Sequence, residues 1–135
     1  MAVDWKESYS VGIDTFDDHH KKLFELINGL SKISESGEAG SDTVSKTLKA
    51  LLDYTKYHFT EEEKALGECG HPDLAIQKEE HEYFSNKVNG YCSYYLAGSE
   101  PLATDVVEFL HEWLANHIME KDQNYKTLLK SKGVN

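Results

Sequence analysis

The fold is decided by a short segment in the middle of the chain, Tyr57-His58-Phe59-Thr60-Glu61-Glu62-Glu63. His58 and Glu62 are four residues apart, so a helix places both side chains on one face. An imidazole nitrogen beside a carboxylate oxygen is a ligand pair that suits iron, zinc or manganese. The segment therefore predicts a helix that carries two candidate metal ligands on one face.

The same face continues towards the N-terminus as an apolar seam. Steps of three and four residues back from His58 reach Thr55, Leu51, Leu48 and Val44, which is the pattern that a bundle helix buries. An unpaired carboxylate on such a face is costly to bury, and a bound cation removes that cost. The alternative is a helix end where the seam meets water and the His and Glu bind nothing.

The composition fits one acidic domain over residues 1–135. With 24 acidic and 14 basic residues, the formal net charge is -10, which argues against nucleic-acid and anionic-membrane partners. The apolar runs are too short to span a membrane, and the first seven residues lack the apolar core of a signal peptide. Cys69 and Cys92 are isolated, which is typical of a cytoplasmic protein with free thiols.

Turns that contain glycine divide the chain into four helical segments. The apolar periodicity predicts an N-terminal arm over residues 1–16, anchored by Trp5, and then helices over about 17–36, 42–66, 72–96 and 102–129. Short turns between helices of this length predict an all-α, up-down-up-down four-helix bundle.

The other three helices also carry polar residues on their inward seams. His20 lies one turn into the first helix, and Gln77 and His81 lie four residues apart in the third. His117 lies in the second half of the fourth helix. Asp122 follows His117 by five residues, about 140° away on a regular helix, so a π-bulge is predicted to bring both to one face. A single such histidine is more often a hydrogen-bonded core residue than a ligand.

Several polar residues lie off the seams. His111 is predicted at the surface, and His71 is predicted at the surface or as a cap in the turn before the third helix. The acidic residues Glu79, Glu80 and Glu82 are predicted to form a solvated face.

In an up-down bundle, the polar seam positions all fall at the same end of the molecule. Seven donors then meet at one height: His20, His58, Glu62, Gln77, His81, His117 and Asp122. A closed zinc site needs four ligands, so seven donors suit two cations with shared bridges. Carboxylates bridge cations and neutral imidazoles do not, so Glu62 and Asp122 are the predicted bridges.

Taken together, these motifs resemble the hemerythrin family, and within it the stand-alone bacterial hemerythrins. The resemblance covers nearly the whole chain, beginning with Trp5 and the Val11-Gly12 pair of the arm. Residues 17–24 match the first-helix motif with His20 in the ligand place. Residues 58–62 match the H-F-x-x-E motif, and residues 117–122 match the H-x-x-x-x-D motif.

The resemblance implies a non-haem di-iron centre, with an oxo or hydroxo bridge, that binds O2 reversibly for storage, delivery or sensing. By this resemblance His20 and His58 bind one iron, which keeps an open position for O2. The second iron takes His81, His117 and the residue at position 77, and Glu62 and Asp122 bridge the pair. The implied role is that of a binder rather than an enzyme. From the seams, the predicted apolar wall of the O2 pocket is Phe24, Phe59, Trp113, Leu114 and Ile118.

One position departs from the family pattern. The family has a histidine where this chain has Gln77, whose amide oxygen is a weaker donor to ferrous iron than imidazole. Gln77 could bind the iron directly, hold a water there, or leave that iron five-coordinate. This departure favours an alternative function, a di-iron enzyme or a handler of peroxide or nitric oxide. A further alternative is a metal-binding or partner-binding bundle without gas chemistry, and sensing would need an unidentified protein partner.

Overall fold

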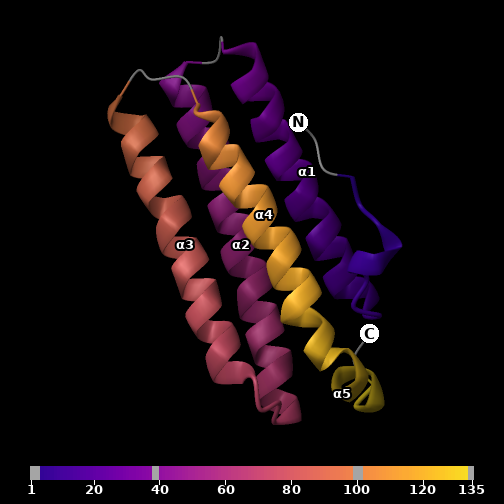
Figure 1. Cartoon of the computed structure of the whole chain (residues 1–135). Coiled ribbons are helices and arrows are strands. Elements are labelled where there is room, and N and C mark those ends of the chain that lie inside the picture. The colour runs from indigo at the N-terminus through magenta and orange to yellow at the C-terminus, as the bar shows by residue number, and fades with distance from the viewer. Residues whose placement is uncertain (1–3, 38–39, 99–101, 134–135) are drawn as a thin grey trace.

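Four long helices lie antiparallel and side by side, joined by short turns (Figure 1). The structure is a computed structural model that describes residues 4–37, 40–98 and 102–133. The long helices are α1 (Asp14–Ser36), α2 (Ser41–Cys69), α3 (Leu74–Ala97) and α4 (Thr104–Glu120). The short elements are the 3-10 turns η1 (Glu7–Tyr9) and η2 (Asp122–Tyr125) and the helix α5 (Lys126–Ser131). The predicted all-α four-helix bundle is confirmed.

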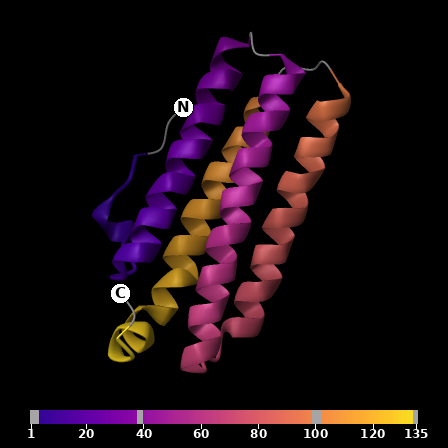
Figure 2. The ribbon, with the colours of Figure 1, turned by 180° about the vertical axis from the view of Figure 1, so that it is seen from behind.

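Two glycines end the first two helices. Gly37 (φ 64°) follows α1 and Gly70 (φ 65°) follows α2, and both adopt the left-handed conformation that a residue with a Cβ avoids. The Gly37 N–H donates to the carbonyl of Ile33, which closes the last turn of α1. Each chain reversal therefore sets two neighbouring helices antiparallel. Seen from behind in Figure 2, α2 lies between α1 and α3.

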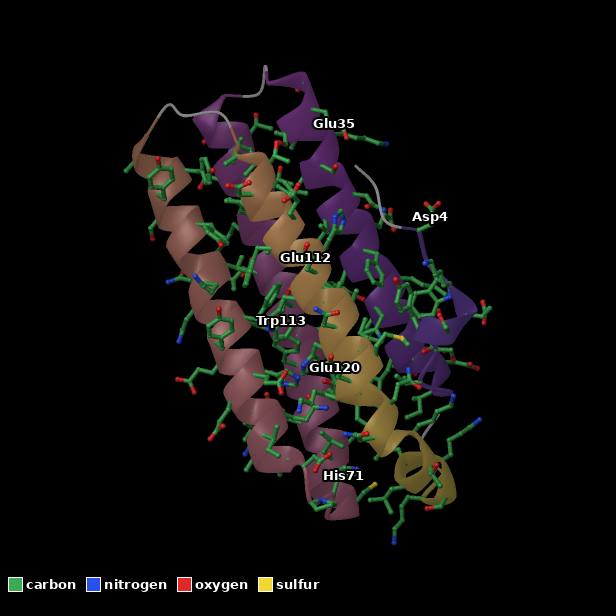
Figure 3. The ribbon with its side chains drawn as sticks, in the orientation of Figure 1. Asp4, Glu35, His71, Glu112, Trp113 and Glu120 are labelled. Carbon is green, nitrogen blue, oxygen red and sulfur yellow. The ribbon has the colours of Figure 1, made fainter. Side chains whose placement is uncertain are left out.

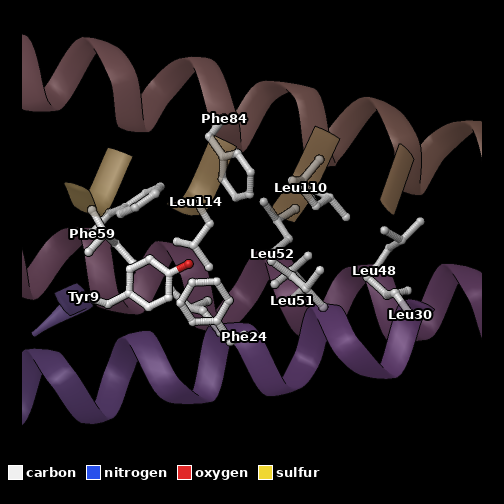
Figure 4. Close-up of a cluster of buried hydrophobic side chains, with 14 of the residues drawn as sticks. Tyr9, Phe24, Leu30, Leu48, Leu51, Leu52, Phe59, Phe84, Leu110 and Leu114 are labelled. Carbon is white, nitrogen blue, oxygen red and sulfur yellow. The ribbon is translucent and has the colours of Figure 1, made fainter. Parts of the chain in front are cut away.

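A cluster of buried apolar side chains packs between the helices (Figure 4). Leu30, Leu48, Leu51 and Leu110 are fully buried and come from three different helices. Phe59 lies at the other end of the cluster in Figure 4, next to the polar site described below. The seam periodicity that predicted the helices is thus the buried stripe of each one. None of the described helices is both long and apolar enough to cross a membrane.

The N-terminal arm is fixed to the outside of α1. Trp5 and Tyr9 pack their rings against Phe24, with ring centroids 6.3 and 5.2 Å away. The carboxylate of Asp17 accepts hydrogen bonds from the Ser10 hydroxyl (2.5 Å) and from the Val11 N–H (2.8 Å). The arm ends where α1 begins at Asp14, three residues before the predicted start.

The fourth helix ends earlier than predicted, and the predicted π-bulge is wrong. Instead of one helix over 102–129, α4 stops at Glu120, and a 3-10 turn begins at Asp122. The Lys121 N–H still donates to the His117 carbonyl, and the Asn124 N–H then donates to the Lys121 carbonyl. The tighter turn changes the direction of the chain, and α5 folds back towards α2. The 3-10 turn still brings His117 and Asp122 to the inside of the bundle, as the bulge was expected to do, because both are buried.

Candidate metal centre

The structure brings all seven predicted donors to one end of the bundle, the lower end in Figure 1. The exposed fraction of each is at most 2%: His20, His58, Glu62, Gln77, His81, His117 and Asp122. They come from the start of α1, the end of α2, the start of α3, the end of α4 and the first residue of η2. The core is therefore polar at this level and apolar above it.

One group of donors consists of His20, His58, Glu62 and Asp122, whose ligand atoms lie within 4.8 Å of one another. His20 Nε2 lies 3.2 Å from Asp122 Oδ2. His58 Nε2 lies 3.2 Å from Glu62 Oε2, and the two Nε2 atoms are 3.0 Å apart. Two imidazoles and two carboxylates thus converge on a space the size of one cation.

A second group consists of His81, His117 and Glu62. His81 Nε2 lies 2.9 Å from Glu62 Oε1 and 3.2 Å from His117 Nε2. His117 Nε2 lies 3.2 Å from Asp122 Oδ1. Each carboxylate therefore presents one oxygen to the first group and its other oxygen to the second, which is the arrangement of a ligand that bridges two cations.

Gln77 lies in the first turn of α3, next to these groups. Its side-chain N–H donates to Asp122 Oδ1 at 3.0 Å. Its Oε1 is buried and has no hydrogen-bond partner in the described residues. This oxygen is a candidate ligand atom, and the N–H of the same amide contacts the Asp122 oxygen that faces His117.

Buried polar atoms without a hydrogen bond concentrate at this site. Six such side-chain nitrogen or oxygen atoms occur in the described residues, and four belong to the cluster: His20 Nδ1, Glu62 Oε1, Gln77 Oε1 and Asp122 Oδ2. Two of these, Glu62 Oε1 and Asp122 Oδ2, nevertheless lie within 3.2 Å of an imidazole nitrogen that could be protonated. Buried polar groups in proteins nearly always have partners. Three of the four are oxygens that a cation would coordinate, so the residues present fit a metal centre.

A ring of further residues holds the donors from outside. The Tyr125 hydroxyl, fully buried, donates to Glu62 Oε2 at 2.7 Å. Nδ1 of His58 lies 2.8 Å from Nδ1 of His19. On the other side, Nδ1 of His81 lies 2.8 Å from Glu63 Oε2, and Nδ1 of His117 lies 3.0 Å from Glu80 Oε1. The seam pattern predicted no role for Tyr125, Glu63 or His19, although Tyr125 follows Asp122 by three residues and Glu63 adjoins Glu62.

Without a cation, the carboxylates hold protons on two imidazoles. Burial opposes the charged form of His20, but Asp122 and Glu62 outweigh it and raise the pKa of His20 to about 9. Burial likewise opposes protonation of His117, and Asp122 leads the groups that raise its pKa to about 9. Burial opposes ionisation of Glu62, yet the neighbouring imidazoles hold its pKa well below the usual value. Positive charge is thus drawn to the place where a cation would sit.

The predicted pocket residues do not all lie beside the first group. Phe59 stacks on His81 with ring centroids 3.7 Å apart, and Trp113 stacks on His117 at 4.6 Å. Figure 3 labels Trp113 on α4, on the side that faces α3. Both rings therefore cover the second group, and Phe59 also lies 5.9 Å from the ring of His58 in the first group. Phe24 packs under the arm, and Leu114 and Ile118 are buried in the core.

Phe16 is a further aromatic residue beside the first group. Its ring lies edge-on to His58, with centroids 5.8 Å apart, and it also contacts Tyr125 at 5.9 Å. The pocket prediction omitted Phe16, although it precedes His20 by four residues on the same seam.

The predictions for polar residues off the seam have different outcomes. His111, predicted at the surface, is 4% exposed, so that prediction is wrong, and its Nε2 lies 3.0 Å from Asn28 Oδ1. Glu80, predicted on a solvated face, is 30% exposed, and its Oε1 also contacts Nδ1 of His117, which the prediction did not include. His71 accepts the N–H of Asp73 and so caps the turn before α3 (Figure 3).

Comparison with known proteins gives one consistent result. Residues 11–129 match the family model of the hemerythrin HHE cation binding domain. A bacteriohemerythrin of Stenotrophomonas maltophilia is 32% identical over 127 residues, with 94% of this chain and 81% of that protein covered. A bacteriohemerythrin of Clostridium acetobutylicum is 31% identical, with 90% and 96% covered. A crystal structure of wild-type hemerythrin superposes with a TM-score of 0.87 at 28% identity, with 96% of this chain and 98% of that chain covered.

Proposed function

The chain belongs to the hemerythrin family, and from this premise we propose that it is a non-haem di-iron protein that binds O2 reversibly. The observation that carries the proposal is the placement of Glu62 and Asp122. Each directs one oxygen at the His20 and His58 pair and the other at the His81 and His117 pair, at 2.9–3.2 Å. This geometry supports two metal sites that share both carboxylates.

The proposed ligands divide into two half-sites. The first half-site is His20 and His58, and the second is His81, His117 and Oε1 of Gln77, with Glu62 and Asp122 shared. The first half-site has one terminal donor fewer, so it is the one that leaves room for a diatomic ligand. Two ferrous ions would supply the electrons and the open position that reversible O2 binding needs.

The surrounding residues keep the site dry and rigid. Phe16, Phe59 and Trp113 cover imidazole faces and edges, so water reaches the donors poorly. Tyr125 holds one oxygen of Glu62, and His19 fixes the ring of His58 through its Nδ1. Such outer contacts orient ligands and set their basicity. The free cysteines Cys69 and Cys92 support a reducing compartment, and we propose the cytoplasm.

The test is anaerobic reconstitution of the full chain with ferrous iron, followed by cycles of O2 and argon. We expect two irons per chain and a visible charge-transfer absorption that appears with O2 and disappears under argon. The variant His58→Ala should lose this response, whereas His111→Ala, which removes a buried histidine outside the site, should keep it. Fewer than two irons in the wild-type chain, or irreversible bleaching at the first O2 exposure, would contradict the proposal. Irreversible turnover would instead support the enzyme alternative that Gln77 raised.

A further inference from the structure

The two half-sites differ in what stands behind their imidazoles. In the second half-site, both rings have a carboxylate at Nδ1: Glu63 Oε2 lies 2.8 Å from His81, and Glu80 Oε1 lies 3.0 Å from His117. In the first half-site neither ring has one. His20 Nδ1 has no hydrogen-bond partner in the described residues, and His58 Nδ1 faces another imidazole, His19.

The second half-site is also the one with the weaker donor set. Gln77 offers it an amide oxygen where an imidazole would bind ferrous iron more strongly. Gln77 also donates its N–H to Asp122 Oδ1, the oxygen that faces His117. This hydrogen bond draws electron density from the shared carboxylate on the same side. Gln77 thus weakens the second half-site in two ways.

A carboxylate behind an imidazole strengthens that imidazole as a ligand. When Nε2 binds a cation, Nδ1 carries the proton and donates it to the carboxylate, which fixes the tautomer and raises the electron density of the ring. Loss of such an outer partner typically weakens metal binding about 10–100-fold. The geometry at His81 and His117 has this form twice.

Glu63 and Glu80 are placed so that they act across helix interfaces. Glu63 reaches from α2 to His81 on α3, and Glu80 reaches from α3 to His117 on α4. Their side chains are 26% and 30% exposed, so each carboxylate keeps part of its hydration. Lys121 Nζ lies 3.6 Å from Glu80 Oε2, so the other oxygen of this carboxylate has a cationic neighbour.

We propose that Glu63 and Glu80 are positioning residues that retain the metal of the second half-site and offset the weak donation of Gln77. This inference rests on the proposed di-iron function. Glu63 and Glu80 do not bind the metal themselves, and their role is to keep the iron affinities of the two half-sites similar.

The test uses Glu63→Gln and Glu80→Gln, because glutamine keeps an oxygen to accept the N–H and removes only the charge. The full chain is loaded with two ferrous ions under argon and challenged with increasing amounts of a ferrous chelator. We expect each variant to lose the iron of the second half-site at about 10–100-fold lower chelator concentration than the wild type. The iron of the first half-site should be lost at the same chelator concentration as in the wild type.

Two comparisons make the result specific. Glu82→Gln removes the same charge from an exposed residue on α3 that lines the same surface hollow as Glu63, and it should release iron as the wild type does. In a Gln77→His background, the effect of Glu63→Gln should shrink, because a stronger third donor no longer needs support.

Wild-type retention of both irons in Glu63→Gln and Glu80→Gln would overturn the inference, and so would an equal loss in Glu82→Gln. An undiminished loss in the Gln77→His background would overturn the offsetting role. Circular dichroism confirms that each variant is folded. A wild-type chain that never holds two irons would instead refute the proposed function, so the two failures are distinguishable.

Discussion

At the scale of single residues, the buried charge of Glu62 depends on its hydrogen-bond donors. Tyr125 is fully buried and donates to Glu62 Oε2 at 2.7 Å. Because hydrogen bonds to charged groups contribute about 1.5–3 kcal/mol, Tyr125→Phe should lower the unfolding free energy of the metal-free protein by that amount. Urea denaturation measures it. Tyr57→Phe, at a side chain 53% exposed, is the matched control and should change little. Equal stability of the two variants would contradict the importance of this contact.

The imidazoles also set the pH dependence of the metal-free protein. The pKa of His20 and of His117 is raised to about 9, so their stabilising protons are fully present below 6.5 and are lost as pH rises towards 9. Burial lowers the pKa of His19 to about 4 and also lowers that of His58, so stability falls as pH drops below 6.5. Stability measured between pH 5 and 9 should therefore peak near 6.5. A continuous rise to pH 9 would show that these charges are wrongly assigned.

The sequence could predict the inner donors but not the residues around them. Seam spacing specifies which side chains point inward, and the structure buries His20, His81 and His117 as that spacing predicts. The contact of Glu80 with His117 was missed because Glu80 lies off the seam, where periodicity favours solvent. Its orientation depends on a neighbouring helix that offers an N–H, and that information lies in tertiary packing.

At the scale of elements, the arm is coupled to α5 through a glycine. Gly12 has φ 72°, and a Cβ there would lie 3.2 Å from Cε of Lys126. Gly12→Ala should therefore lower the unfolding free energy by about 1–2 kcal/mol, the cost of a left-handed conformation in a residue with a side chain. Gly29→Ala is the matched control. Gly29 lies within α1 with open space around it, so this change should stabilise the protein by about 0.5–1 kcal/mol. Thermal unfolding of both variants measures these changes in the unfolding free energy. If both variants were destabilised, or both stabilised, the role of the left-handed conformation at Gly12 would be contradicted.

The end of α4 shows which features of an element the sequence leaves undetermined. The five-residue spacing of His117 and Asp122 required a departure from regular helix. Widening by a π-bulge and tightening into a 3-10 turn both satisfy that spacing. In this protein the chain after α4 forms the tighter 3-10 turn. That turn also brings Tyr125 to Glu62 and lets α5 return to α2. Local spacing alone could not distinguish these two solutions.

At the scale of the whole molecule, the metal centre joins all four long helices and η2. Cations that bind only the folded state should therefore stabilise the entire bundle, by about 2.7 kcal/mol for one site at a free concentration a hundred times its dissociation constant. Calorimetric unfolding with and without ferrous iron under argon should show the increase. His58→Ala should abolish most of it, and His111→Ala should retain it. A melting temperature that is independent of iron would contradict a structural role for the metal.

The order of elements along the chain has a consequence for biosynthesis. Asp122 and Tyr125 belong to the 3-10 turn that follows the last long helix, so they leave the ribosome after every other contributor to the centre. A nascent polypeptide that has folded only its first three helices still lacks Asp122, one of the two proposed bridging carboxylates. It also lacks Tyr125, whose hydroxyl donates to the other carboxylate, Glu62. The proposed centre is therefore completed only after the fourth long helix and the 3-10 turn that follows it have been made and folded.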